Sequence, residues 1–383
     1  MKKIVLIITV FLNLNSAFAQ EPTRVITTAT PFLLIATDAR SAAMADMGVA
    51  TSADTYSMMY NPAKFAFLED QQGVGLSYTP YLSSIANDIS LAQLSYSNRF
   101  NERSAFAVNL RYFGLGDIQL SDEFGNNGAV VNPNEFTLEG AYALKLSERF
   151  SMGVGGKLIS SNLKINDGTN DASAASTFAV DVSAFYQSEE IYFNDFNGRF
   201  RAGVNFQNMG PKISYDNDVL NENFIPANMR LGAGFDFLLD DYNKVTVTGE
   251  VTKLLVPTPQ DFNNDGVIDS QDANTYRQIG WVDGIFKSFN DAPDGISEEL
   301  KETTWALGAE YWYQDSFALR TGYFHEAETK GARKYFTLGA GFKYNVIKID
   351  VSYLFSASQV RNPLENTLRF SLSFSLGDKY DEL

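Results

Sequence analysis

The residue pattern with the clearest chemistry in this chain is a run of twelve residues that begins at Asp261. Oxygen-bearing side chains occupy positions 1, 3, 5, 9 and 12 of the run, and Gly266 occupies position 6, where a calcium loop turns sharply. Ca²⁺ takes about six or more oxygen ligands, and this spacing wraps them around one point. We therefore expect a structural Ca²⁺ held by Asp261, Asn263, Asp265, the Val267 carbonyl, Asp269 and Asp272. The alternative is a solvated acidic loop without metal.

The predicted calcium loop belongs to a long connection, residues 255–302, between two expected strands. A helix is expected after it, at 273–289, whereas Pro257 and Pro259 preclude a helix directly before it. Connections of this length are usually functional or disordered. This one also carries a set of apolar side chains, which predict a protein-docking surface or, alternatively, packing on the rim of the fold: Tyr276, Ile279, Trp281, Ile285, Phe286 and Phe289.

The remaining chemistry in the sequence argues against an enzyme. His325 is the only histidine and there is no cysteine, so no Ser-His-Asp or Cys-His arrangement can be proposed. His325 is expected at a strand end, with a role in an aromatic girdle or a loop. The formal net charge of −16 also excludes a nucleic-acid-binding protein.

The elements that must position these residues are strands with strictly alternating faces. In the last strand, Leu368, Phe370, Leu372, Phe374 and Leu376 alternate with Arg369, Ser371, Ser373 and Ser375. A soluble sandwich also alternates. The strands here are about ten residues long, as tilted membrane strands are, and the 19 Tyr and 30 Phe gather at strand ends. These features favour an all-β, 14-stranded antiparallel transmembrane β-barrel.

The fourteen strands are expected near 73–81, 88–97, 104–114, 134–146, 150–165, 174–187, 199–208, 226–239, 244–254, 303–313, 316–326, 334–344, 346–356 and 366–376. Long and tight connections alternate between them, apart from a longish one at 188–198 on the tight side. Outer-membrane barrels have short periplasmic turns and long external loops, so 255–302 is predicted to be external. An even number of strands predicts that both chain termini lie in the periplasm.

Two segments precede the expected barrel, which takes up residues 71–383. Residues 1–19 combine Lys2 and Lys3, an apolar run and a small-residue cleavage site at Ala19, and so predict a secretory signal peptide. The apolar run is short for the alternative, a retained membrane helix. Residues 20–70 do not alternate and contain two short helix-like stretches, Asp38 to Gly48 and Tyr56 to Phe67. We expect this segment to plug the barrel lumen; the alternative is a periplasmic cap.

The side chains expected to face the lumen carry both signs of charge, from Arg111 and Glu139 in one half to Arg320 and Asp350 in the other. A selective pore usually shows one dominant sign at its constriction. Mixed charges are better explained by internal ion pairs and by contacts to a plug, so an open porin is not expected.

Three short motifs resemble a known family. Residues 38–50, DARSAAMADMGVA, resemble the N-terminal signature of the PorV/PorQ group of FadL-like barrels, and Asn61-Pro62-Ala63 matches an element that these proteins carry before their first strand. With 78–81, YTPY, and the layout of the whole chain, the likeness is closest to the PorV (LptO) family of the type IX secretion system of Bacteroidota. The resemblance marks Asp38, Arg40, Gly48, Asn61 and Pro62 as plug residues.

The resemblance implies a FadL-like barrel in the outer membrane without enzyme activity. Proteins of this family bind the C-terminal signal domain of secreted cargo as it leaves the SprA/Sov-type translocon barrel. They then deliver the cargo to the PorU-type sortase attachment complex. Outer-membrane lipid is the other expected partner, and nucleic acid is not one. A calcium loop is not a feature that the family requires.

Two further functions are alternatives to this role as a shuttle, which binds cargo at the translocon and delivers it to the attachment complex. A FadL-type outer-membrane channel for hydrophobic small molecules would need an apolar pocket in the lumen and a gap in the wall, and the mixed lumen charges count against it. A surface hydrolase barrel fails for want of a credible nucleophile and base.

Overall fold

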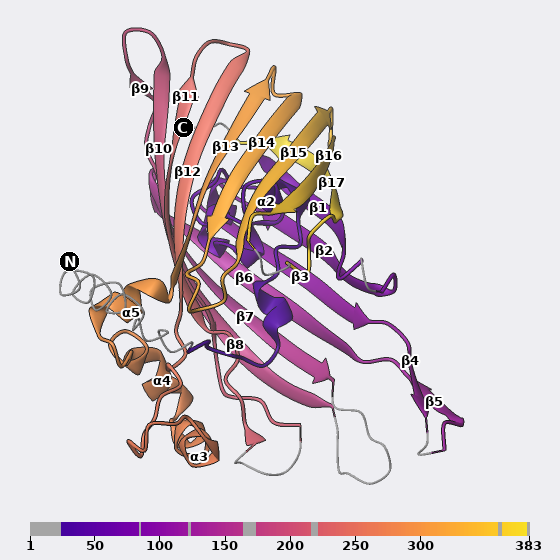
Figure 1. Ribbon diagram of the computed structural model, residues 1–383. Helices are drawn as coiled ribbons and strands as arrows, with labels where there is room; N and C mark the ends of the chain where they lie inside the picture. The colour runs from indigo at the N-terminus through magenta and orange to yellow at the C-terminus, as the bar shows by residue number, and fades with distance from the viewer. Residues whose placement is uncertain are drawn as a thin grey trace, which may run out of the picture.

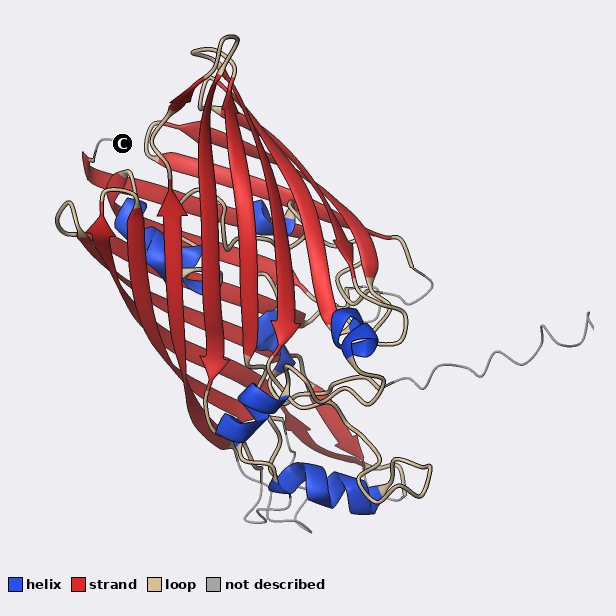
Figure 2. Cartoon of the chain, turned by 90° about the vertical axis from the view of Figure 1, so that its left-hand side faces the viewer, coloured by secondary structure: helices blue, strands red, loops and turns tan. Residues whose placement is uncertain are grey.

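The computed structural model describes residues 24–83, 86–121, 124–163, 174–215, 221–358 and 362–380. The predicted signal peptide, 1–19, lies outside these residues. In the described part, fourteen long antiparallel strands form a closed barrel (Figures 1 and 2). They are β1 (Asp70–Pro80), β2 (Ile89–Arg99), β3 (Ser104–Leu115), β6 (Asn134–Ser147), β7 (Phe150–Asn162), β8 (Ala175–Gln187), β10 (Asn197–Met209), β11 (Asn228–Leu238), β12 (Asn243–Leu254), β13 (Thr303–Tyr313), β14 (Phe317–His325), β15 (Lys334–Tyr344), β16 (Ile347–Ser356) and β17 (Leu368–Lys379).

Each barrel strand pairs with its neighbours in chain order, and β1 also pairs with β17, which closes the ring. Leu76 lies opposite both Leu372 of β17 and Leu94 of β2. Closure matters because an open edge would leave backbone N–H and C=O groups unpaired in lipid. The predicted 14-stranded antiparallel barrel is therefore confirmed, with every expected strand present.

The alternating sequence pattern becomes the two faces of the wall. Strand β3 exposes Phe106, Val108, Leu110 and Tyr112 and buries Ala107, Asn109 and Arg111. The apolar set points outward and the polar set points into the lumen, which is the arrangement that a lipid environment selects.

The connections divide the barrel into two ends, here called the short-turn end and the long-loop end. Tight turns such as those at 148–149 and 345–346 lie at the short-turn end, together with the longer 188–196 connection, which carries β9 (Ile191–Tyr192). The long-loop end carries the hairpin of β4 (Ile118–Ser121) and β5 (Asn127–Val131). It also carries the 255–302 connection.

The segment before β1 lies inside the barrel. It contains η2 (Pro31–Leu34), α2 (Ala39–Ala42), η3 (Ser57–Met59) and η4 (Pro62–Phe67), and Figure 1 shows it within the ring of strands. The backbone N–H of Ala39 donates to Ser371 Oγ at 2.7 Å and that of Ala63 to Ser183 Oγ at 3.0 Å, on two different parts of the wall. The expected lumenal plug is confirmed, although the helix at Asp38–Gly48 shrinks to the four residues of α2.

Arg24, the first described residue, does not lie on the short-turn side, where both termini were predicted. The ends of β1 and β17 do meet there, at Asp70 and Lys379. Arg24, however, pairs with Asp294 and Glu298 of the 255–302 connection, at the opposite end. The reason is the plug: the chain crosses the lumen from the long-loop end before it enters the wall.

The 255–302 connection folds into three helices, α3 (Ser270–Gln278), α4 (Trp281–Lys287) and α5 (Ile296–Lys301). The single helix expected at 273–289 is thus divided, because Ile279 is extended (φ −65°, ψ 123°) and Gly280 begins a new helix. Among the described residues, no helix is both long and apolar enough to cross a membrane.

Candidate functional site

The plug residues singled out by their motif form the centre of the lumen. Asp38 begins α2, and its carboxylate accepts hydrogen bonds from the Ser41 backbone N–H at 2.8 Å and from the Tyr60 hydroxyl at 2.8 Å. A side-chain oxygen at this position satisfies an N–H that the first helical turn leaves unpaired. Asp38 is fully buried, so one carboxylate ties the two halves of the plug together.

Arg40 fastens the plug to the barrel wall. Its guanidinium donates to Glu310 of β13 at 2.8 and 3.0 Å and to Asp54 of the plug at 2.7 Å. Arg320 of β14 then pairs with the same Glu310 and, at 2.8 Å, with Asp350 of β16. A two-pronged guanidinium contact fixes orientation as well as charge, so this chain of pairs locks the plug in one position.

Gly48 and Asn61 set how closely the plug approaches the wall. A Cβ on Gly48 would lie 2.2 Å from the Tyr60 ring, which leaves no space for a side chain. The Gly48 N–H donates to Glu250 of β12 at 2.8 Å. The Asn61 amide donates to the Val49 and Ala184 carbonyls at 2.9 and 3.0 Å, and Pro62 begins η4 directly after it.

Wall charges that face the lumen are paired with one another or with the plug, as expected from their mixed signs. Buried pairs join Arg111 with Glu139 (2.6 Å), Lys157 with Asp181 (2.9 Å), Arg201 with Asp236, Arg230 with Glu250 (2.9 Å) and Arg369 with Asp46 (2.8 Å). Because these charges have partners of opposite sign, they meet the condition under which buried ions are tolerated. This network spans the lumen and leaves it filled rather than open.

The half of the lumen nearer the long-loop end holds a cluster of apolar side chains, and the chain itself fills it. Phe32 and Leu33 of η2 are buried against wall residues that include Leu91, Ile159 and Phe113, whose ring stacks on Phe32 at 6.0 Å. A channel for hydrophobic compounds needs this space free. Here it is occupied by the plug.

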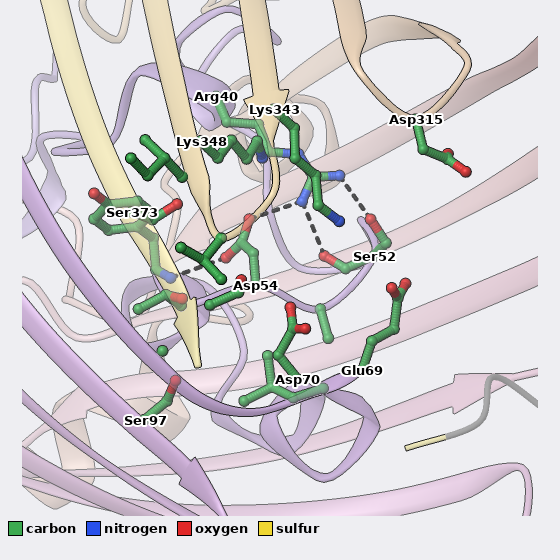
Figure 3. A pocket seen from close by; sticks show the side chains of 18 of the residues that line it. Arg40, Ser52, Asp54, Glu69, Asp70, Ser97, Asp315, Lys343, Lys348 and Ser373 are labelled. Carbon is green, nitrogen blue, oxygen red and sulfur yellow. Dashed lines mark hydrogen bonds and ion pairs between the residues drawn. The ribbon is translucent and has the colours of Figure 1, made fainter. Parts of the chain in front are cut away.

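A polar cavity of about 320 Å³ lies between the plug and the wall at the short-turn end. Figure 3 shows Arg40, Asp54, Lys343 and Lys348 on one side of it, with Asp70 on the other. Arg40 and Asp54, which both line the cavity, are paired with each other, so the cavity borders the locked plug.

The predicted calcium residues are drawn into one turn of chain. The Asp261 carboxylate accepts the N–H groups of Asp265 (3.2 Å) and Gly266 (2.7 Å), and Gly266 has a φ of +92°, which favours glycine. The Asp272 carboxylate reaches back to the N–H groups of Phe262 (2.7 Å) and Asn263 (3.2 Å). The last predicted ligand, Asp272, therefore returns to the start of the loop, but no three of the loop's aspartates bring oxygens within 4.8 Å of one another.

The six residues predicted to form a docking surface do not all face outward. Phe286 and Phe289 are exposed, at 74% and 44%. The other four are partly covered; Tyr276, for example, donates to the Pro257 carbonyl at 3.0 Å and meets Phe224 edge-on at 5.4 Å. Sequence reasoning missed three exposed residues nearby, Val282, Ile296 and Leu300. The i, i+4 spacing of Ile296 and Leu300, with Glu298 and Glu302 on the opposite side of the helix, could have revealed the last two.

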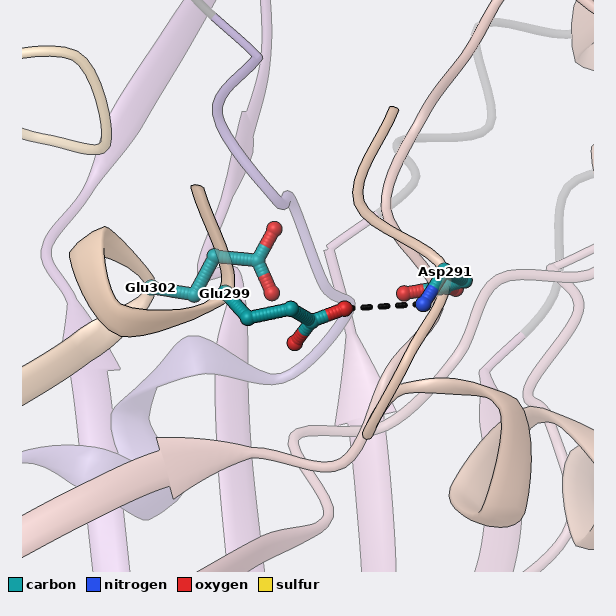
Figure 4. Close-up of side chains that lie close together, drawn as sticks. All are labelled: Asp291, Glu299 and Glu302. Atoms are coloured by element: carbon teal, nitrogen blue, oxygen red, sulfur yellow. Dashed lines mark hydrogen bonds between the residues drawn. The ribbon is translucent and has the colours of Figure 1, made fainter. Parts of the chain in front are cut away.

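Three carboxylates of the long loop, Asp291, Glu299 and Glu302, bring their oxygens within 4.8 Å of one another (Figure 4). Burial raises the pKa of Asp291 to about 6, and the charges of Glu299 and Glu302 add to that effect. Burial also raises the pKa of Glu299, but hydrogen bonds from Lys253 and the Ala292 N–H outweigh it and hold that pKa below its ordinary value. The lysine makes this cluster an internal salt-bridge network.

His325 lies at the end of β14, as expected, in a group of aromatic rings. Its imidazole stacks on Trp305 at 5.0 Å, and Trp305 is also 5.5 Å from Tyr323. Rings in this position form the aromatic girdle at the long-loop end.

Comparisons with known proteins agree with this geometry. The family model described as "Type IX secretion system protein PorV" matches residues 18–261. A search of the curated proteins finds no match. The TodX monoaromatic hydrocarbon channel deltaS2 mutant is 11% identical with a TM-score of 0.50, over 91% of this chain and 100% of that one. A Pseudomonas aeruginosa FadL homologue is 11% identical with a TM-score of 0.45, over 92% and 99%. At these identities, the likeness concerns the fold alone.

Proposed function

The chain belongs to the PorV family of type IX secretion system proteins, and from that premise we propose that it is the outer-membrane shuttle of this system. It binds the C-terminal signal domain of secreted cargo at the SprA/Sov-type translocon. It then carries the cargo to the PorU-type sortase attachment complex, without enzyme activity of its own.

The observation that carries this proposal is the contrast between a filled lumen and an exposed apolar surface on the long loop. Arg40 and its ion-pair chain hold the plug in place, so cargo is held outside the barrel. Phe286 and Phe289, together with Val282, present apolar area to solvent beside the long-loop end. Large aromatic side chains of this kind are the usual anchors of protein interfaces.

Photo-crosslinking from the loop tests the shuttle. A photoreactive amino acid replaces Phe286 in cells that secrete cargo, and covalent adducts are identified after solubilisation in detergent. Adducts with a cargo C-terminal domain, with the translocon barrel or with the attachment complex are expected. The control places the same group at Phe124, which is 89% exposed near the β4–β5 hairpin at the same end.

A paired variant measures the strength of the contact. Phe286→Ala with Phe289→Ala should weaken binding of a purified cargo domain roughly 30-fold, the effect of losing about 2 kcal/mol at an interface anchor. Phe124→Ala should leave the affinity unchanged. Equal affinities for all three proteins would remove the loop from the binding surface.

The channel for hydrophobic compounds is less well supported, since Phe32 and Leu33 fill the apolar half of the lumen. Uptake of an aromatic hydrocarbon by vesicles that contain the protein, with no protein partner recovered from cells, would favour the channel over the shuttle.

The long loop is proposed to hold a structural Ca²⁺. Asp261, Asn263, Asp265, the Val267 carbonyl, Asp269 and Asp272 would supply oxygen ligands, after the aspartate side chains rotate toward one point. The positive φ of Gly266 and the return of Asp272 to the start of the loop fit such a group. The metal would neutralise the acidic side chains and stiffen the chain that leads into α3.

Limited proteolysis tests the calcium site. Calcium should protect 255–302 of the unmodified protein from digestion, and Asp265→Ala should abolish that protection. Asp283→Ala, which removes an exposed carboxylate from α4, serves as the control and should keep it. If the digestion pattern is the same with calcium and with a chelator, the proposed calcium site is wrong.

A further inference from the structure

Helix α5 lies against the outer face of the barrel wall. The evidence comes from Lys253 of β12, a strand whose residues 246, 248 and 250 point into the lumen while Val247 and Val251 are exposed outward. Lys253 is two residues beyond Val251, so it shares the outward face. It is nevertheless only 7% exposed, because Glu299 and Glu302 each place an oxygen 2.8 Å from its Nζ.

The face of α5 that meets the wall is entirely engaged in ion pairs. Lys330, from the connection between β14 and β15, lies 2.6 Å from Glu298 and 2.9 Å from Glu302. Arg24 adds a contact of 2.9 Å to Glu298. Three cations thus neutralise the three glutamates, and the polar side of α5 is buried against the rim.

The opposite face of α5 is apolar and uncovered. Ile296 and Leu300 are four residues apart, which places them on the same side of a helix. They are 75% and 69% exposed, more than most lipid-facing side chains of the wall. With the glutamates turned toward the barrel, these two side chains point away from it.

The position of α5 along the membrane normal follows from the strand that it leads into. Strand β13 begins at Thr303, and Trp305, the first residue of the aromatic girdle on this strand, is five residues after Leu300. Leu307, 54% exposed, continues the lipid-facing surface toward the middle of the wall. Tryptophan girdles mark the boundary between acyl chains and headgroups, so α5 lies just beyond that boundary.

We propose that α5 is an interfacial membrane anchor, whose Ile296 and Leu300 insert into the headgroup–acyl boundary of the leaflet at the long-loop end. The occupant of this face is lipid, because α5 leads directly into β13, whose Trp305 and Leu307 carry the lipid-facing surface of the wall. Its polar side needs no water, since Lys253, Lys330 and Arg24 satisfy it. The anchor fixes the height of the long loop above the membrane and is independent of the proposed shuttle function.

The absence of cysteine from the chain allows a direct test with nitroxide spin labels. Single cysteines replace Ile296 and Leu300, with Leu307→Cys as the lipid reference and Asp283→Cys on α4 as the water reference. Each labelled protein is reconstituted into vesicles of phosphatidylethanolamine and phosphatidylglycerol. Collision of the label with oxygen, which concentrates in lipid, is compared with collision with a water-soluble nickel chelate.

At 296 and 300 we expect oxygen collisions to dominate, as at 307, and nickel collisions to dominate at 283. Nickel-dominated collisions at both 296 and 300 would overturn the anchor, because the face would then lie in water. Labels that are immobilised and reached by neither reagent would overturn it too, since protein would then cover the face. Migration of the folded barrel on unheated gels checks each variant, and crosslinking from Phe286 reports on the shuttle separately.

Discussion

The plug and the long loop are two segments outside the barrel strands, and they differ in how far their side chains are buried. The plug buries nearly everything it carries: Asp38, Arg40 and Asn61 have no more than 4% exposure and each is hydrogen-bonded. The long loop pairs its glutamates with Lys253 and Lys330 of the barrel and with Arg24, but it leaves Phe286, Ile296 and Leu300 exposed. A buried segment whose charged groups are paired can fill a space within the chain, whereas a segment with exposed apolar area is expected to contact something outside the chain.

The largest expected effect comes from breaking the seal at Arg40. Arg40→Ala leaves Glu310 and Asp54 buried without their main partner, which typically costs about 3–5 kcal/mol. The variant should unfold at lower urea concentration and should conduct ions in planar bilayers. Arg149→Ala breaks a pair between two exposed side chains, Arg149 and Glu189, and should change stability far less, because solvent screens an exposed pair. If Arg40→Ala conducts no more than Arg149→Ala, the ion pairs do not hold the plug.

A smaller effect is expected from emptying the apolar half of the lumen. Phe32→Ala removes a buried ring and should cost about 3 kcal/mol through the cavity that it leaves. The cavity should bind an apolar fluorescent probe, which the unmodified protein should exclude. Phe32→Leu, which keeps most of the volume, is the matched control. Probe binding by the unmodified protein would show that the lumen is not filled as described.

The long loop should respond to pH through Asp291. Its folded pKa of about 6 exceeds its ordinary value of 3.8 because of burial, so the closed loop binds the proton more tightly than the open one. This contribution is complete below about pH 4 and is lost as the pH rises through about 6. Allowing for solvent screening, the loss is about 1 kcal/mol.

Hydrogen exchange of α4 and α5 measures this change. Exchange should quicken between pH 5 and pH 7 beyond its intrinsic pH dependence, and Asp291→Asn should remove the excess. Glu298 and Glu299 act in the opposite sense: their folded pKa values are lowered, so their contribution is lost as the pH falls below about 4. If Asp291→Asn leaves the excess exchange intact, another titratable group must cause it.

The smallest expected effect is at Arg24, where the two regions are joined. Arg24→Ala removes its pairs with Asp294, which is 60% exposed, and Glu298, and should cost about 0.5–1 kcal/mol. Exchange in α5 should quicken slightly while exchange in the plug stays unchanged. A change in the plug as large as that in α5 would mean that the regions are coupled through the N-terminal segment.

Much of the barrel could be predicted because its signal is local. A strand in a lipid-facing wall must alternate at every second residue, so Leu368 to Leu376 reveals both the strand and its two faces without reference to any other segment. The same holds for the motif residues of the plug, where Asp38 and Asn61 have side chains suited to begin short helical turns. The acidic loop at Asp261 was predicted from spacing along the chain, and the metal there remains a proposal.

What the sequence alone determined is therefore the set of strands, their inward and outward faces, and the presence of a compact segment ahead of them. Only the tertiary structure decided that the segment enters from the long-loop end, that Arg40 pairs with Glu310, and that Lys253 is covered by α5. These outcomes join residues that are as many as 274 positions apart. Such contacts depend on which strands close the ring and in what register, and no local periodicity encodes that choice.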